Sequence, residues 1–211
     1  MGNDDSNYLF RVESDSGIDD KFHRMVEDKY KSKITTTEIF SYIYAVLHSE
    51  NYREKYKNNL SKELPRIPIV NNIFNFKLLS DFGTKLIVIH SKYEEADPYK
   101  VNFKEGDLSL INMEDQKKFF RVEKMKFAKK GDKSRVIYNK NITIENIPLQ
   151  AYEYVVNGKS ALEWVMERQC IKIDKASGII NDANDYANEI MENPKYPLEL
   201  FQRIITVSLE T

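Results

Sequence analysis

The sequence predicts an α+β fold: an antiparallel β-meander with helices packed around it, a helical region before it and a docking helix at the end. Three observations support this prediction. Short β-branched and aromatic runs separated by turn residues lie between residues 121 and 145. Apolar residues recur at helical spacing between residues 39 and 95. The last fifteen residues carry Leu200, Ile204 and Val207 on one side of a helix.

Composition indicates one large domain or two small ones with a substantial core. The chain has 211 residues, of which 41% are hydrophobic, and a formal net charge of −1. Its single cysteine, Cys170, excludes an internal disulfide framework and favours a reducing, cytoplasmic location. The three histidines lack zinc-site spacing, so no metal site is expected. No apolar run approaches the about 18 residues of a membrane span, and the first residues show no charged-then-apolar signal pattern.

The first third of the chain is predicted to be helical. Residues 1–33 are expected to form a lead-in from an upstream domain, with a short helix at residues 20–30, and residues 34–98 a helical subregion. Thr35 and Glu38 have the spacing of a capping box. A buried helix is expected to follow over residues 39–48, and another to begin at Ser49.

The segment before residue 98 combines an extended stretch with a long helix. Pro65 and Pro68 force an extended backbone around Arg66, which is a candidate contact to DNA or a partner, or an ordinary ion-pair residue. Residues 72–95 are predicted to form a helix in which Gly83 permits close packing with another element. Its expected apolar face is Phe74, Leu78, Phe82, Leu86 and Ile89.

Residues 99–211 are expected to form an α+β region built on the basic stretch 121–140. This stretch has eight basic residues and two acidic ones, a local net charge of +6 in a chain that is nearly neutral. Val122, Lys124 and Lys126 are expected to share one face of a strand. A turn at Gly131 and another at residues 139–141 then connect the strands of the meander.

Such a surface is suited to contact with phosphates, and nearby amides and aromatic rings are suited to contact with bases. Asn139 and Asn141 are candidates for contacts to base edges, and Tyr138 for stacking. The alternative is a solvated hairpin whose lysines only discourage aggregation of sheet edges. The full set of candidate DNA-contacting residues is Lys124, Lys126, Lys129, Lys130, Lys133, Arg135, Tyr138, Asn139, Lys140, Asn141 and Arg66.

The remaining motifs favour structure over catalysis. Gly158-Lys159-Ser160 lacks the glycine that a phosphate-binding loop needs at position 153, so Asn157 and Gly158 are interpreted as entry to a helix at residues 159–168. Asn193-Pro194 lacks the second proline of an amino-methyltransferase motif, and no adenosylmethionine loop accompanies it. A short strand at residues 170–173, a turn at Ser177-Gly178, a helix at 182–191 and a helix beginning at Pro197 complete the prediction.

Three segments resemble a known family: FSYIYAVLHSENYREKYKNNLSKELPRIP, VEKMKFAKKGDKSRVIYNKNITIENIP and YEYVVNGKSALEWVMERQ. They are similar to the C-terminal specificity (target-recognition) domain of Type ISP restriction–modification enzymes, whose reading frames are often labelled DEAD/DEAH-type helicases. The resemblance covers residues 34–211. It implies a fragment that recognises double-stranded DNA, without catalysis of its own. It also implies a parent chain with nuclease, ATP-dependent translocase and adenine methyltransferase activities that uses ATP, magnesium and S-adenosylmethionine.

Two other hypotheses compete with DNA recognition. In the first, the aromatic-rich helices around Tyr42, Tyr44, Tyr52 and Tyr56 dock on the upstream methyltransferase or helicase-like domains of the same polypeptide, which requires an exposed apolar patch. In the second, the chain is an independent enzyme. The second is the weaker, because no nucleophile–base pair, supported carboxylate pair or metal-ligand cluster is visible in the sequence.

Overall fold

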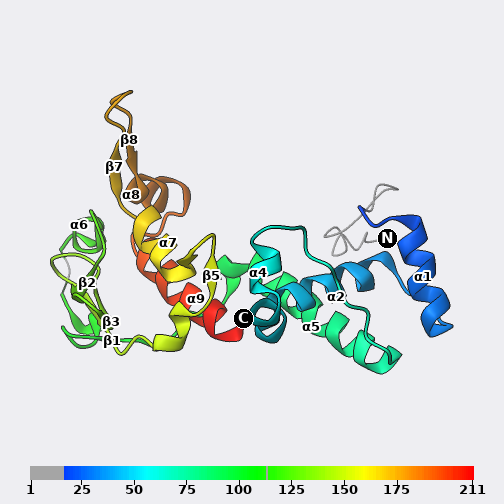
Figure 1. The fold of residues 1–211 in the computed structure, drawn as a ribbon. Helices are drawn as coiled ribbons and strands as arrows, with labels where there is room; N and C mark the ends of the chain where they lie inside the picture. Colours follow the sequence, from blue (N-terminus) through cyan, green and yellow to red (C-terminus); the bar gives the residue numbers. More distant parts are fainter. Residues whose placement is uncertain (1–16, 113) are drawn as a thin grey trace, which may run out of the picture. The chain divides into compact units, whose positions relative to one another are not determined.

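A computed structural model describes residues 17–112 and 114–211 (Figure 1). The chain divides into an N-terminal unit ending at Val88 and a C-terminal unit from Ile89 to Thr211. The division falls within a helix, before the boundary expected after residue 98. Residues 94–97 belong to the C-terminal unit because Glu94, Ala96 and Asp97 accept hydrogen bonds from its last helix. Across the described residues, none of the helices is both long and apolar enough to span a membrane.

The N-terminal unit is helical in its described part. Its helices are α1 (Asp20–Tyr30), α2 (Thr36–His48), α3 (Glu50–Lys55), α4 (Lys57–Leu60) and α5 (Ile73–Ser91), the last continuing into the C-terminal unit. The core contains Val26, Ile34, Ile39, Tyr42, Val46, Tyr52 and Phe76. Val26 of α1 is fully buried in this core, so residues 18–33 are part of the unit. The sequence had instead suggested that they belong to a lead-in. Residues 1–16 of the expected lead-in lie outside the described residues.

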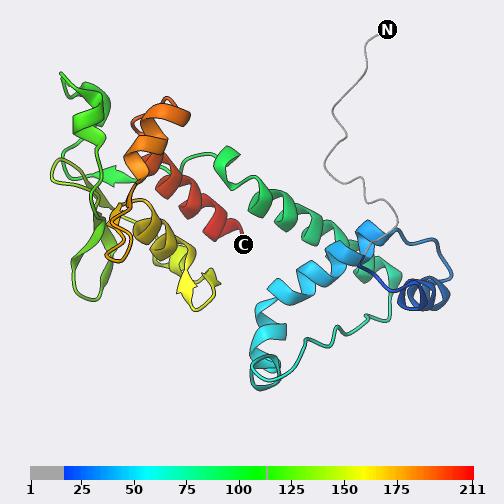
Figure 2. The same cartoon turned by 90° about the horizontal axis from the view of Figure 1, so that it is seen from above.

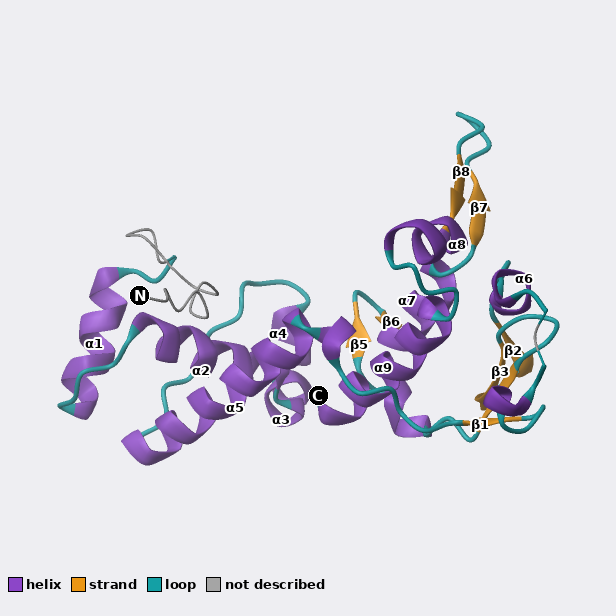
Figure 3. Ribbon diagram, turned by 180° about the vertical axis from the view of Figure 1, so that it is seen from behind, coloured by secondary structure: helices purple, strands orange, loops and turns teal. Residues whose placement is uncertain are grey.

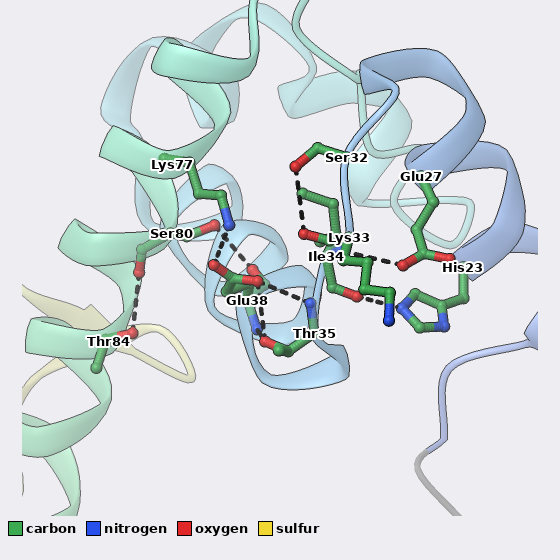
Figure 4. Close-up of polar contacts among 10 residues, drawn as sticks. All are labelled: His23, Glu27, Ser32, Lys33, Ile34, Thr35, Glu38, Lys77, Ser80 and Thr84. Atoms are coloured by element: carbon green, nitrogen blue, oxygen red, sulfur yellow. Dashed lines mark hydrogen bonds and ion pairs between the residues drawn. The ribbon is translucent and has the colours of Figure 1, made fainter.

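The predicted capping box of α2 is confirmed, and it also joins α2 to α5 (Figure 4). The Thr35 hydroxyl accepts from the backbone N–H of Glu38, and the Glu38 carboxylate accepts from that of Thr35. Lys77 of α5 forms an ion pair with the same carboxylate. The Ser80 hydroxyl donates to the Glu38 carbonyl at 2.9 Å. One glutamate therefore caps one helix and holds a second.

The contact between α2 and α5 is closest at Gly83, as predicted. A Cβ atom placed on Gly83 would lie 1.8 Å from the backbone oxygen of Ser41. The buried face of α5 consists of Phe76, Ser80 and Gly83. The apolar face predicted from sequence was wrong at its N-terminal end, because Phe74, Leu78 and Phe82 are exposed. Small residues, not large apolar ones, face α2 here because the two backbones nearly touch.

The C-terminal unit holds all the described strands, and the predicted β-meander is confirmed (Figure 3). Its main sheet is antiparallel with strand order β1-β4-β3-β2. The strands are β1 (Asn102–Phe103), β2 (Lys126–Lys129), β3 (Asp132–Ile137) and β4 (Thr143–Glu145). Lys129 pairs with Asp132 across the β2–β3 turn, where Gly131 has a φ of +83°.

Helices cover this sheet and complete the α+β fold. They are α6 (Gln116–Phe120), α7 (Ala161–Arg168), α8 (Ala183–Asp185) and α9 (Tyr196–Glu210), with single turns η1 (Tyr93–Glu95), η2 (Leu108–Leu110), η3 (Leu149–Tyr152) and η4 (Tyr186–Ile190). The docking helix α9 packs beside α7 (Figure 2). Its predicted inward residues Leu200, Phe201, Ile204, Ile205 and Val207 are all buried, so its prediction is confirmed.

Two local predictions differ from the structure. The strand expected from residue 122 begins only at Lys126. In a regular strand Val122 and Met125 would point to opposite faces, but both side chains are buried, so the backbone departs from a strand there. Asn157 and Gly158 form the turn between β5 (Val155–Val156) and β6 (Lys159–Ser160), both with positive φ. The helix after them is capped instead by Ser160, in a second capping box with Glu163.

Candidate nucleic-acid interface

One hollow on the C-terminal unit gathers basic side chains from separate parts of the chain. Its volume is about 560 Å³. We call it the basic hollow; its lining contains five cationic residues and one anionic residue. The lining residues are Lys118, Arg121, Glu123, Lys124, Lys126, Ile137, Asn139, Lys140 and Asn141. Of the candidates predicted from the sequence, Lys124, Lys126, Asn139, Lys140 and Asn141 come together here.

Two asparagines fix the segment that forms one wall of the basic hollow. The Asn139 side-chain amide donates to the carbonyls of Phe119 and Arg121, at 2.8 and 3.0 Å. The Asn141 amide donates to the Phe119 carbonyl at 3.0 Å. The turn after β3 thereby holds the end of α6 and the residues that follow it. The amide donors predicted for base edges are used within the chain, so Asn139 and Asn141 position the wall.

A third asparagine holds the same segment from the other side. Asn184 accepts from the backbone N–H of Val122 at 2.9 Å and donates to its carbonyl at 2.8 Å. Arg121 forms an ion pair with Asp182 at 2.7 Å. Burial raises the pKa of Asp182, but hydrogen bonds from Asn184 and the neighbouring Arg121 outweigh it and hold this pKa below its ordinary value. Asp182 is therefore a stable counter-ion for Arg121.

This arrangement is suited to binding a polyanion. Lys118, Lys124, Lys126 and Lys140 are exposed, and within residues 17–112 and 114–211 none of the ion pairs involves them. Lysine is a flexible point charge that binds phosphate without demanding one geometry. Four such charges around a hollow with a fixed wall can neutralise phosphates of a backbone that passes over it.

The other predicted lysines and Arg135 lie along the β2–β3 hairpin, in two kinds of environment. Lys129 and Lys130 are exposed at its turn. Lys133 forms an ion pair with Glu163 at 3.2 Å, and its ammonium lies 5.1 Å from the centre of the Tyr152 ring. Arg135 forms an ion pair with Asp132 at 3.2 Å. Lys133 and Arg135 thus already have partners within the chain, whereas Lys129 and Lys130 extend the exposed basic surface.

Two predicted residues lie outside this surface. Tyr138 is fully buried, and its hydroxyl donates to the Phe120 carbonyl at 2.7 Å, so no ring face is available for stacking on a base. The prediction for Tyr138 is corrected to a core role. Burial also raises the pKa of its hydroxyl. Arg66 belongs to the N-terminal unit, where its side chain is 91% exposed and lies 3.5 Å from Glu63.

Sequence reasoning missed two members of the basic hollow, Lys118 and Arg121. Lys118 lies between the predicted loop of residues 99–116 and the basic stretch and received no assignment, and Arg121 was counted in the basic stretch without being assigned a contact. The Asp115 side chain caps α6 by accepting from the Lys118 N–H, and an aspartate followed by helix-forming residues was the available signal. In the part of the chain that the structure describes, no three His, Cys, Asp or Glu residues are arranged to hold a metal ion.

Comparison with known proteins identifies the family. The family model of the Type ISP C-terminal specificity domain matches residues 2–200. The chain belongs to this family. A comparison with curated protein sequences finds no match.

Three solved structures share the fold of this specificity domain, and two of them are of Type ISP restriction–modification enzymes. A nuclease-deletion mutant of LlaGI, in complex with a DNA substrate mimic, aligns with a TM-score of 0.69 and 42% identity over 84% of this chain and 13% of its own. LlaBIII bound to DNA aligns with a TM-score of 0.76 and 33% identity over 99% of this chain and 12% of its own. The DrdV–DNA complex aligns with a TM-score of 0.71 and 30% identity over 92% of this chain and 19% of its own. The chain thus spans less than a fifth of each of these relatives.

Proposed function

We propose that this specificity domain recognises a target sequence in double-stranded DNA, and that the basic hollow holds the phosphates beside that target. The observation that carries the proposal is the gathering of Lys118, Lys124, Lys126 and Lys140 around one hollow with a fixed wall. The three DNA-bound relatives support the choice of DNA as the polyanion. Target recognition needs no chemistry from the domain itself.

We further propose that the chain works as part of a longer cytoplasmic polypeptide. In this proposal, upstream domains of the same polypeptide supply the nuclease, ATP-dependent translocase and adenine methyltransferase activities. Those domains would bind the ATP, magnesium and S-adenosylmethionine that the family resemblance implies. The specificity domain would direct these activities to a DNA sequence.

The salt dependence of DNA binding tests this role of the basic hollow. We expect Lys124→Ala and Lys126→Ala each to weaken binding to a random-sequence duplex pool and to lower the slope of log K against log salt by about one. Lys100→Ala removes an exposed charge that does not line the hollow and is the matched control. Fluorescence anisotropy at several salt concentrations measures both the binding constant and its salt slope. Unchanged binding by the double variant Lys124→Glu/Lys126→Glu would refute the proposal.

A second function, docking on another domain of the parent polypeptide, is favoured by a separate observation. Phe74, Leu78 and Phe82 lie at four-residue spacing on α5 and are 69%, 43% and 50% exposed. This stripe belongs to the N-terminal unit, and exposed apolar surface of this kind marks interaction sites. We expect Phe74→Ser/Phe82→Ser to reduce co-purification with the upstream methyltransferase and helicase-like domains at high salt. Retention of both domains by this variant would rule out the stripe as their docking surface.

A further inference from the structure

A β-hairpin projects from the C-terminal unit (Figure 1), and its isoleucine side chains present an apolar surface to solvent. It consists of β7 (Ile171–Ile173) and β8 (Ile180–Asp182), paired in register from Ile171 opposite Asp182 to Ile173 opposite Ile180. Ile173, Ile179 and Ile180 are 64%, 59% and 63% exposed. Ile173 and Ile180 are directly opposite each other, so both side chains lie on one face of the ribbon.

The end of this hairpin is a well-ordered turn. The Asp174 carboxylate accepts from the backbone N–H groups of Ala176 and Ser177 and from the Ser177 hydroxyl, at 2.8 to 3.0 Å. The Gly178 N–H donates to the Asp174 carbonyl, and the Asp174 N–H donates to the Ile179 carbonyl. These bonds fix the turn, so presenting the isoleucines to a ligand would cost little conformational entropy.

The base of the hairpin is joined to the basic hollow. The Ile171 N–H donates to the carbonyl of Glu123 at 3.0 Å, and Asp182 forms the ion pair with Arg121 at 2.7 Å. Glu123 and Arg121 both line the basic hollow. The projecting apolar ribbon therefore begins at the edge of the surface suited to phosphates, and a duplex held at the hollow would have its grooves beside the ribbon.

We propose that this hairpin enters the major groove of the bound duplex and that Ile173 and Ile180 contact thymine methyl groups. The major groove, about 12 Å wide, admits a two-stranded ribbon. The thymine methyl is the apolar group that this groove displays, and isoleucine is its complement. Lys175 at the exposed turn supplies positive charge toward the flanking phosphates. This inference rests on the proposed DNA recognition and assigns to the hairpin a share of the sequence readout.

Selection from a random-sequence duplex pool, followed by base substitution, tests the inference. We expect the unaltered chain, tested alone and within its full polypeptide, to select duplexes with thymine at fixed positions. Replacing those thymines by deoxyuridine removes only the methyl group and should weaken binding severalfold. Ile173→Ser/Ile180→Ser should weaken binding to the selected duplex about tenfold, abolish the difference between thymine and deoxyuridine, and leave the salt slope unchanged. Leu149→Ser, at a position 60% exposed outside the hairpin, is the matched control.

The possible outcomes separate the two proposals. A chain that binds the pool without sequence preference would overturn the proposed function and the role of the hairpin together. A chain that selects a sequence, yet binds its deoxyuridine version equally well, would overturn the hairpin inference alone. The comparison of thymine with deoxyuridine uses the unaltered protein, so a variant that fails to fold cannot obscure the result. Circular dichroism of the double variant checks its folding.

Discussion

The backbone N–H of Asn141 donates to Oδ1 of Asn139 at 2.8 Å, and the side-chain amides of both residues donate to the carbonyl of Phe119. A short turn after β3 is thereby bound to the end of α6, about twenty residues earlier in the chain. The two amides hold Lys118 and Arg121 in the wall of the basic hollow. The turn thus organises a charged surface to which it adds one charge of its own, that of Lys140.

Asn139→Asp tests this positioning role. Aspartate keeps the acceptor for Asn141 but loses the amide donors to Phe119 and Arg121, so we expect a loss of about 1 kcal/mol in the free energy of unfolding. DNA affinity should also fall, because the wall carrying Lys118 and Arg121 loses its fixed position. Urea denaturation and anisotropy measure the two effects. Asn102→Asp adds the same charge at an exposed site, and equal losses in affinity for both variants would attribute the effect to charge alone.

Lys133 is expected to differ from Lys129 and Lys130 when each is replaced by methionine. Lys133→Met removes the ion pair with Glu163 and the contact with the Tyr152 ring, and should cost about 0.5 to 1 kcal/mol of unfolding free energy. It should leave the salt slope of DNA binding nearly unchanged. Lys129→Met and Lys130→Met should lower that slope and leave stability unchanged. Thermal unfolding together with salt titration distinguishes the two patterns, and a reversed pattern would contradict this division.

Gly83→Ala is expected to destabilise the N-terminal unit. The new Cβ would lie 1.8 Å from the Ser41 backbone oxygen, and backbone atoms can yield only if the two helices separate. We expect a loss of about 3 kcal/mol, which exceeds the about 1 kcal/mol that alanine gains in helix propensity. Asn75→Ala, on the exposed side of α5, provides the helix-propensity control. Chemical denaturation of both variants gives the comparison, and equal stability of Gly83→Ala and the parent would exclude the close contact.

Glu163 predicts a dependence of stability on pH. A hydrogen bond from the Ser160 hydroxyl, followed by the contact with Lys133, holds the pKa of Glu163 below its ordinary 4.5. The unfolded chain therefore binds this proton more readily, so the stabilisation is complete at neutral pH and is lost as the pH falls below about 4.5. Glu163→Gln should be less stable at pH 7 and should lose less stability on acidification. Parallel slopes for the two proteins in this range would show that Glu163 does not contribute.

The sequence predicted the elements of the fold well where one local interaction decides the structure. The capping box of Thr35 and Glu38, the meander and the inward face of α9 follow from short-range patterns. The face of α5 was predicted wrongly, because hydrophobic periodicity selects large residues, whereas the buried face combines Phe76 with the small residues Ser80 and Gly83, where the backbone of α2 comes close. Asn157-Gly158 is a typical hairpin turn pair, but it was interpreted from the sequence as the entry to a helix.

The candidate site was predictable as a charge pattern but not as a surface. Charge density identified Lys124, Lys126 and Lys140, which the structure places around one hollow. It gave the same weight to Lys133, whose carboxylate partner Glu163 lies thirty residues away in sequence and is found only in the folded chain. The proposed role of the β7–β8 hairpin had no sequence signal, because its position beside the basic hollow depends on the hydrogen bond that Ile171 donates to the Glu123 carbonyl and on the ion pair of Asp182 with Arg121.

The contact at Gly83 joins main chain to main chain. Displacements between packed helices are normally absorbed by side chains that change rotamer, and here no side chain of Gly83 separates the helices. We therefore expect α2 and α5 to move together as one rigid pair of helices. A domain bound to the exposed stripe of Phe74, Leu78 and Phe82 on α5 would therefore be mechanically coupled to α2 through this contact.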